Sequence, residues 1–278
     1  MNDFRADLHT HSLCSDGSLN PTEVLQLAKQ VGLKGISITD HDTLEAYDSN
    51  LLEEAKRLDI LLLPGAELSS QLGNVNLHIL AYGRGLLNDS FKSFLKEIQH
   101  QRIERNQMIL EKLNQNGIEI SEKELKEFAQ KELPHKSKII GRPHIALLML
   151  KKGYVTTIQE AFNKYIKDDA PCYAKGAKFN PETIIDHVHK SKGVAIIAHP
   201  HFYKSRSFID KLLNLPFDGI ECYYSKIDPF YEKKWVDIAT KKRWIITGGS
   251  DFHGEIKPHI PLGCSWVNYD TFQSLYNL

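Results

Sequence analysis

Short apolar segments alternate with amphipathic segments along most of this chain. Six apolar segments are bounded by Gly, Pro or acidic residues, as buried strands are, and they cover residues 33–40, 59–67, 74–83, 193–200, 217–224 and 243–251. Amphipathic segments with apolar residues at helical spacing cover residues 21–32, 44–58 and 181–193. Strands that alternate with helices form βα units, so the pattern predicts an α/β barrel of parallel strands.

The alternation stops between about residues 88 and 170. Residues 91–117 have the pattern of one long helix, and shorter helical patterns follow them without a convincing strand. A chain of 278 residues suits one domain with an insertion better than two equal domains. We therefore expect a barrel formed by residues 1–87 and 171–278, and a mostly helical insertion subdomain at residues 88–170.

Composition bears on what the protein can bind and on where in the cell it is found. Lys plus Arg and Asp plus Glu number 35 each, so the whole molecule has no net charge with which to attract nucleic acid. Four cysteines lie far apart in the sequence, which favours neither a disulfide framework nor a zinc ribbon: Cys14, Cys172, Cys222 and Cys264. The first residues lack the pattern of a signal peptide, and no segment has the composition of a membrane span. These features predict a cytoplasmic protein with no membrane contact.

Histidine and acidic residues occur where the predicted strands end. If residues 5–8 form a first strand, the strands and the loops after them supply nine candidate ligands: His9, His11, Asp16, His41, Glu67, His78, His199, Asp251 and His253. Parallel strands bring their C-terminal ends to one face of a barrel, so these side chains are expected to converge. A single buried histidine is more typical of a hydrogen-bonded core residue, but chance poorly explains ligand types at successive strand ends.

The ligand types and their number indicate a cluster of metal ions. Imidazole and carboxylate groups suit Zn, Mn or Fe, and nine ligands exceed what one ion needs, so we expect two or three divalent ions. Glu67 is the natural bridge, because a carboxylate offers one oxygen to each of two ions. Asp40 and Asp42 are expected to orient His41 or to cap a helix, and Glu221 to have a structural or supporting role.

Cationic residues near the predicted insertion are candidates for binding phosphate. Pro143 suits a helix start, which would place Arg142 and His144 beside a helix N-terminus where anions bind. Both are therefore candidates for catalysis as well as for substrate binding, and the alternative for Arg142 is a solvated cation in a loop. Arg102 and Arg105 on the long predicted helix are further substrate-binding candidates, and His201 is a candidate to support a ligand or protonate a leaving group.

The motifs at these positions resemble the PHP family, the polymerase and histidinol phosphatase family of metal-dependent phosphoesterases. Residues 7–44, DLHTHSLCSDGSLNPTEVLQLAKQVGLKGISITDHDTL, are similar to its opening signature. GAELSS (65–70), LHILAYG (77–83), AHP (198–200) and GSDFHG (249–254) match its later motifs in order. The insertion resembles that of the subgroup acting on nucleotides, which contains 3′,5′-nucleoside bisphosphate phosphatases and the 5′-to-3′ exoribonuclease RNase AM.

This resemblance implies a fold, a ligand arrangement and an activity. It implies a distorted seven-stranded (β/α) barrel with a helical insertion. It also implies one ion at His9, His11, Glu67 and Asp251, a second at Glu67, His78 and His199, and a third at Asp16, His41 and His253. Relatives in the subgroup often follow AHP with a small residue, an Arg and a Tyr. Here the corresponding residues are His201, Phe202 and Tyr203, and Phe202 cannot bind a phosphate.

The expected activity is hydrolysis of a phosphate ester by metal-activated hydroxide. The expected substrate is a phosphorylated small molecule, namely a nucleotide such as a 3′,5′-nucleoside bisphosphate, or a short 5′-phosphorylated RNA, and no obligate protein partner is evident. A histidinol-phosphatase-like monoesterase and a metal-binding barrel without catalysis are alternatives. A polymerase-linked proofreading domain is a further one, although such domains normally belong to much longer chains.

Overall fold

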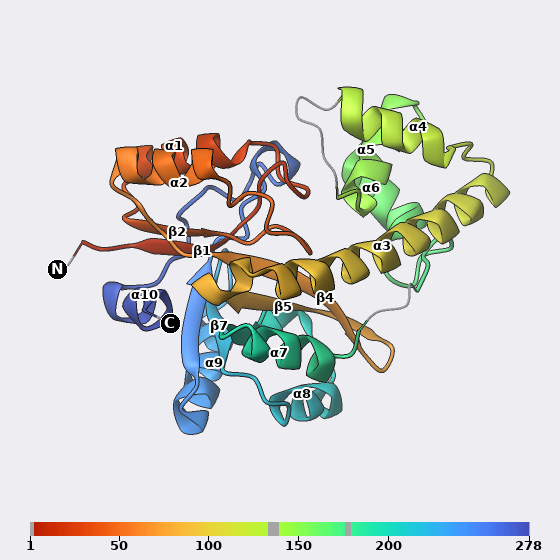
Figure 1. Ribbon diagram of the computed structural model, residues 1–278. Coiled ribbons are helices and arrows are strands. Elements are labelled where there is room, and N and C mark those ends of the chain that lie inside the picture. Colours follow the sequence, from red (N-terminus) through yellow and green to blue (C-terminus); the bar gives the residue numbers. More distant parts are fainter. Residues whose placement is uncertain (1–2, 133–138, 176–178, 278) are drawn as a thin grey trace.

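The computed structural model describes residues 3–132, 139–175 and 179–277 (Figure 1). The strands are β1 (Ala6–Thr10), β2 (Gly35–Ile38), β3 (Leu61–Leu62), β4 (Gly65–Leu72), β5 (Val75–Tyr82), β6 (Val194–Ile197), β7 (Gly219–Tyr224) and β8 (Ile245–Gly249). The α-helices are α1 (Pro21–Gln30), α2 (Ser49–Leu58), α3 (Asp89–Gln115), α4 (Glu122–Glu127), α5 (Arg142–Lys151), α6 (Ile158–Ala161), α7 (Pro181–Lys190), α8 (Arg206–Leu213), α9 (Pro229–Lys242) and α10 (Tyr269–Tyr276). Short 3₁₀ and π helices complete the elements: η1 (Arg84–Leu87), η2 (Phe128–Glu132), η3 (Phe162–Ile166), η4 (Pro200–Phe202) and η5 (Gly254–Ile256). The mixed α/β class predicted from the sequence is confirmed.

The strands form two sheets. β1, β2 and β3 form a parallel sheet, and β4 to β8 form a second sheet in chain order. In the second sheet β6, β7 and β8 are parallel, whereas β5 pairs antiparallel with both β4 and β6. Single-residue bridges, Thr10 with Phe252 and His41 with Glu67, join the sheets, but across the described residues they do not close a ring of strands. The predicted seven-stranded parallel barrel is therefore not confirmed.

A tight hairpin explains this departure. Leu72 pairs with Val75, which leaves only Gly73 and Asn74 to connect β4 to β5, and Gly73 takes a positive φ of 59°. A two-residue turn reverses the chain directly, whereas a parallel connection needs a crossover of about a dozen residues or more. The segments predicted as two successive parallel strands therefore lie antiparallel.

Helices α1 and α2 begin at polar caps and lie together over the first sheet (Figure 1). Asn20 caps α1 in a capping box with Glu23, and Asp48 caps α2 by accepting from the backbone N–H of Leu51. Their buried faces, which include Leu25 and Leu51, pack in a cluster with β2. A separate cluster containing residues of β1, β5 and β6 joins the two sheets.

Helix α3 connects the sheets to the helices of the predicted insertion (Figure 1). Its first half packs in the core of the second sheet through Phe91, Phe94 and Ile98, and its second half packs with α4, α5 and η3 through Ile109 and Leu113. The predicted division at residues 88 and 170 stays a prediction, and α3 takes part in the packing on both sides of it. Neither α3 nor any other helix in the described part of the chain is both long and apolar enough to cross a membrane.

Candidate metal centre

The structure brings together all nine residues that the sequence predicts as metal ligands. Each has a donor atom within 3.7 Å of a donor atom of another member. Most follow strand ends, as expected, but Glu67 lies near the start of β4 and His78 lies within β5. Seven of the nine are buried, and only His41 and His78 are partly exposed. The β4–β5 hairpin thus supplies two ligands, Glu67 and His78. The sequence assigned them to successive parallel strands, whereas they lie on antiparallel ones.

A first group contains His9, His11, Glu67 and Asp251. The Nε2 atoms of His9 and His11 lie 3.4 and 3.2 Å from Oε2 of Glu67. The same two nitrogens lie 3.5 and 3.3 Å from Oδ1 of Asp251. Four donor atoms therefore point at one small volume.

These spacings fit a shared metal ion better than hydrogen bonds. Two donors bound to one ion at about 2.1 Å, at angles of about 90° to 110°, lie about 3.0 to 3.4 Å apart. The Nε2 atoms of His9 and His11 and Nδ1 of His41 are buried and have no hydrogen-bond partner in the described part of the chain. Buried polar atoms without a partner are costly, and divalent cations would satisfy these nitrogens.

Glu67 divides its two oxygens between groups. Its Oε1 lies 2.8 Å from Nδ1 of His78 and 3.0 Å from Nε2 of His199, and these two nitrogens are 3.3 Å apart. Its Oε2 faces the first group and also lies 3.1 Å from Nδ1 of His41. This is the arrangement that a bridging carboxylate requires.

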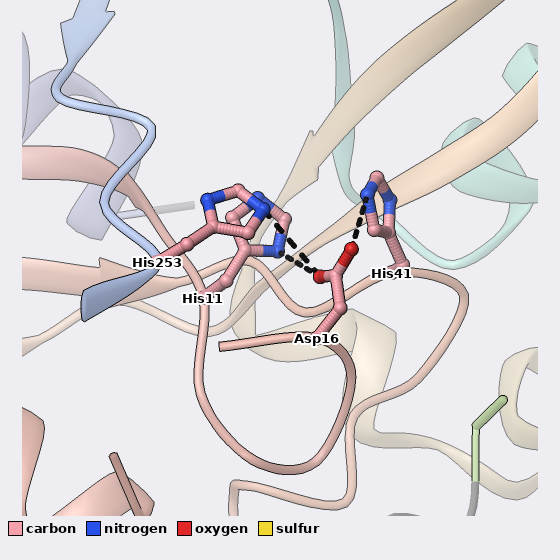
Figure 2. Close-up of side chains that lie close together, drawn as sticks. All are labelled: His11, Asp16, His41 and His253. Carbon is pink, nitrogen blue, oxygen red and sulfur yellow. Dashed lines mark ion pairs between the residues drawn. The ribbon is translucent and has the colours of Figure 1, made fainter. Parts of the chain in front are cut away.

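A third group surrounds Asp16 (Figure 2). One oxygen of Asp16 lies 3.7 Å from Nδ1 of His11 and 3.5 Å from Nε2 of His253, and the other lies 3.7 Å from Nε2 of His41. His11 and His41 each present their second ring nitrogen to Glu67. The two histidines therefore connect groups that the family resemblance keeps apart.

The loop that carries Asp16 is fixed by Asp40. The Asp40 carboxylate accepts from the backbone N–H of Ser12 at 2.7 Å and from the hydroxyls of Ser12 and Ser15 at 2.5 and 2.6 Å. Asp42 instead accepts from Ser69 and pairs with Arg102. The sequence-based expectation that these carboxylates orient His41 or cap a helix is not what their contacts show.

Residues outside the nine hold the ligands in place. Glu221 accepts from the backbone N–H of His199 at 2.7 Å, and its other oxygen lies 2.8 Å from Nδ1 of His9. Tyr224 and Lys257 donate to Oδ2 of Asp251 at 2.6 and 2.7 Å, which leaves Oδ1 facing the first group. Sequence analysis missed Tyr224 and Lys257, because neither belongs to a ligand type or a spacing that predicts this role.

Burial and neighbouring charges shift the pKa values of the clustered side chains in opposite directions. Burial raises the pKa of the Glu67 carboxyl, but the nearby histidines outweigh it and hold that pKa well below its usual range. Burial lowers the pKa of His11, but the carboxylates of Asp251, Glu67 and Asp16 outweigh it and raise the pKa to about 9. The cluster therefore favours positive charge among its carboxylates, which divalent ions would supply in place of protons.

A cavity of about 430 Å³ opens beside the cluster. Its lining includes three candidate ligands, Asp16, His41 and His253, and three arginines: Arg102, Arg105 and Arg142. Arg102 is bound to Asp42, and Arg142 donates to Asp168 at 2.7 Å. The three arginines predicted from the sequence to bind substrate therefore line one cavity.

Arg105 differs from its neighbours. It is buried, and one of its terminal nitrogens donates a long hydrogen bond of 3.4 Å to Asn106. Among the described residues, its Nε atom has no hydrogen-bond partner and no acidic side chain forms an ion pair with it. Burial and the charges of Arg102 and Arg142 lower its pKa to about 9. A buried cation beside two others and without an acidic partner is the strongest indication of an anion site in this cavity.

The two remaining predicted residues are neutral histidines. His144 is buried in the first turn of α5, and its Nδ1 accepts from the backbone N–H of Gly141 at 3.0 Å. Burial lowers the pKa of His144 to about 4. His201 lies in η4 against Phe202 and Tyr224, and burial together with His199 lowers its pKa to about 4.

The chain is similar in sequence to known proteins. Residues 7–174 match the model of the PHP domain. A 5′-3′ exoribonuclease from Haemophilus influenzae is 28% identical over 271 residues, which span 94% of this chain and 91% of the relative. A 3′,5′-nucleoside bisphosphate phosphatase from Chromobacterium violaceum is 28% identical over 253 residues, or 89% and 86% of the two chains.

The chain is also similar to a solved structure over most of its length. A protein from Bifidobacterium adolescentis, named as a metal-dependent phosphoesterase, matches with a TM-score of 0.85 and 28% identity, over 97% of this chain and 94% of the other. The family resemblance inferred from the ordered motifs is therefore confirmed.

Proposed function

Because this chain belongs to the PHP domain family and is a metal-dependent phosphoesterase, we propose that it hydrolyses nucleotide-type phosphate esters. The proposed substrates are 3′,5′-nucleoside bisphosphates or short 5′-phosphorylated RNA. The observation that carries this proposal is Arg105, a buried cation without an acidic partner among the described residues, in a cavity that also contains candidate metal ligands. The names of the exoribonuclease and bisphosphate phosphatase relatives support the same substrate class.

We propose that the nine clustered residues hold two or three divalent ions. Nitrogen and carboxylate donors without thiolates suit Mn, Fe or Zn. Bound ions supply Lewis acidity, which makes water acidic enough to act as a nucleophile near neutral pH and offsets charge on a phosphoryl group. Glu67, with oxygens facing two groups, is the proposed bridge.

The remaining residues position the substrate. Arg105 and Arg142 face the cavity, where their guanidinium groups can donate to phosphate oxygens. Arg102 is the weakest of the three candidates, since it is bound to a buried carboxylate, Asp42. Arg142 is bound to an exposed one, Asp168, and Arg105 to none among the described residues.

His144 and His201 are not among the residues that line this cavity. Their predicted roles in binding a phosphate or protonating a leaving group stay proposals, and a neutral ring at pH 7 leaves each with one donating and one accepting nitrogen.

Phosphate release tests the proposal. The substrates are adenosine 3′,5′-bisphosphate, AMP, histidinol phosphate and a 5′-phosphorylated RNA trinucleotide, each with Mn²⁺ and with chelator. We expect Mn²⁺-dependent release from the bisphosphate or the RNA, and a loss in Glu67→Gln of about 1,000-fold or more, since metal catalysis contributes several kcal/mol. Arg105→Met should raise KM about 10- to 100-fold, because it removes a charge-assisted hydrogen bond.

Two surface variants serve as matched controls. Glu182→Gln and Arg57→Met change an exposed glutamate and an exposed arginine, and neither should alter the kinetics. Turnover of histidinol phosphate alone would contradict the nucleotide proposal and leave a monoesterase. No turnover of any ester by metal-loaded protein would favour a fold that binds metal without catalysis.

A further inference from the structure

Phe202 is an exposed aromatic residue beside the candidate metal centre. It ends the short helix η4, three residues after His199, and 57% of its surface is exposed. Its ring centroid lies 5.1 Å from the ring of His199, whose Nε2 faces Glu67. Single exposed aromatic residues are common on proteins, so its exposure alone indicates nothing. What distinguishes Phe202 is direct contact with a candidate ligand.

Neighbouring rings hold Phe202 in place. Its centroid lies 4.3 Å from that of His201 and 5.7 Å from that of Tyr224, and the Tyr224 hydroxyl is bound to Asp251. Contacts with three rings fix the side chain, while more than half of it stays open to solvent. A planar surface that is already fixed loses little conformational entropy when a ligand stacks on it.

This ring and the cavity that contains the arginines meet the cluster at different histidines. His78 lines that cavity, and its ring lies 5.3 Å from the ring of His199. His199 in turn contacts Phe202, which does not line the cavity. Cationic groups and an aromatic group are therefore both adjacent to the cluster, at different histidines. A nucleotide has parts that match both: a charged phosphate and a flat base one sugar away from it.

We infer that Phe202 is a stacking site for the base of the nucleotide whose phosphate ester is hydrolysed. This inference rests on the proposed function and names a specificity determinant for it. Every base has a π face, so stacking favours substrates that have a base over base-free phosphate esters, without selecting one base. Stacking on an aromatic side chain contributes about 1–3 kcal/mol per base.

Paired substrates with and without a base test the inference. They are adenosine 3′,5′-bisphosphate and ribose 3,5-bisphosphate, measured with Mn²⁺. For Phe202→Ala we expect kcat/KM on the adenosine compound to fall about 5- to 100-fold, mainly through KM, and kcat/KM on the ribose compound to stay unchanged. Phe202→Trp should keep the preference, because it keeps an aromatic face. Phe230→Ala, a change at another exposed aromatic residue, should leave both substrates unaffected.

Binding without turnover separates this inference from the proposed function. The indole fluorescence that Phe202→Trp adds, taken as the difference from wild type, should be quenched by the adenosine compound and not by the ribose compound. Base-dependent quenching without hydrolysis would support stacking while the phosphoesterase proposal fails. An equal loss on both substrates in Phe202→Ala would mean that the ring only supports His199. No loss on either substrate, or equal quenching by both compounds, would also overturn the inference.

Discussion

At the scale of single residues, Glu221 holds two of the candidate ligands. Its carboxylate lies 2.8 Å from Nδ1 of His9 and accepts from the backbone N–H of His199. The first contact places the proton of His9 on Nδ1 and leaves Nε2 to bind a metal ion. An amide in its place could bind either tautomer of the ring, so the tautomer would no longer be fixed.

We expect Glu221→Gln to weaken metal binding about 10- to 100-fold, the usual effect of removing a carboxylate behind a ligating histidine. Competition with a fluorescent chelator for Mn²⁺ or Zn²⁺ would measure the change. Asp186→Asn, an exposed acidic residue of α7, is the matched control. Equal metal affinity in Glu221→Gln and wild type would show that the contact with His9 does not influence binding.

His144 predicts a pH dependence of stability. Burial lowers its pKa to about 4 from an ordinary value of 6.5. As the pH falls below about 6.5, His144 binds a proton in the unfolded chain but not in the folded chain. The free energy of unfolding therefore decreases as the solution becomes acidic. By pH 5 this loss is about 2 kcal/mol relative to pH 7.5.

His144→Asn removes this titration and keeps an acceptor for the Gly141 N–H. Urea unfolding of metal-free protein at pH 7.5 and 5 should therefore show a loss of stability that is about 2 kcal/mol smaller in the variant than in wild type. His100→Asn, at an exposed histidine, should behave like wild type. The same pH dependence in His144→Asn and wild type would contradict the low pKa.

The candidate ligands could be predicted at this scale, but their supporting residues could not. Ligand-type residues at successive strand ends, such as His9 and Asp251, are visible in the sequence because strands are recognisable there. Tyr224 and Lys257 bind Asp251 through contacts that depend on how β7, β8 and the next loop pack. No local pattern encodes that packing.

At the scale of elements, one ion pair fastens α3 to the sheets. Asp42 is fully buried, and it pairs with Arg102 of α3 while accepting two hydrogen bonds from Ser69. Removing one partner of a buried pair leaves an uncompensated charge, at a cost of about 3–5 kcal/mol.

We expect Arg102→Met to lower the free energy of unfolding by about 3 kcal/mol. Adding Asp42→Asn to that variant should cost about 1–3 kcal/mol less than the sum of the single changes. Urea unfolding of the single and double variants would measure this coupling. Arg57→Met, which breaks an exposed pair with Glu54, should change the free energy of unfolding far less, because water and salt screen an exposed pair. Additive single effects would mean that the pair does not hold α3.

Strand direction is the part of the fold that the predicted βα alternation gives wrongly, at β4 and β5. The apolar segments around Glu67 and His78 were recognisable, and their pairing depended on a turn of two residues, Gly73 and Asn74. A glycine followed by asparagine between two strand patterns is itself a hairpin signal. Weighing it against the βα alternation would have predicted the antiparallel pair, but not the separation into two sheets.

At the scale of the whole molecule, metal ions should stabilise the fold. Carboxylates that approach one another in the cluster need positive charge, and ions that bind only the folded chain add about 2.7 kcal/mol per site at 100 times Kd. We expect melting to shift upward by about 5 °C or more when Mn²⁺ replaces chelator.

Calorimetry of wild type and Glu67→Gln in both conditions would measure this shift. The variant should lose most of the shift, because its amide cannot supply two anionic oxygens. Glu182→Gln should keep all of it. Equal melting temperatures of wild type with metal and with chelator would contradict a metal centre built by these residues.

The candidate ligands are far apart in the sequence, from His9 to His253, and this determines when during synthesis the metal centre can form. His9 belongs to the first strand, whereas Asp251 and His253 follow the last one. A ribosome adds about 5–20 residues per second, so the first and last ligands are made about 10 to 50 seconds apart. During that interval the emerging chain has histidines but lacks the residues that complete two of its groups. The three groups therefore cannot be complete on a chain whose synthesis has not yet reached His253.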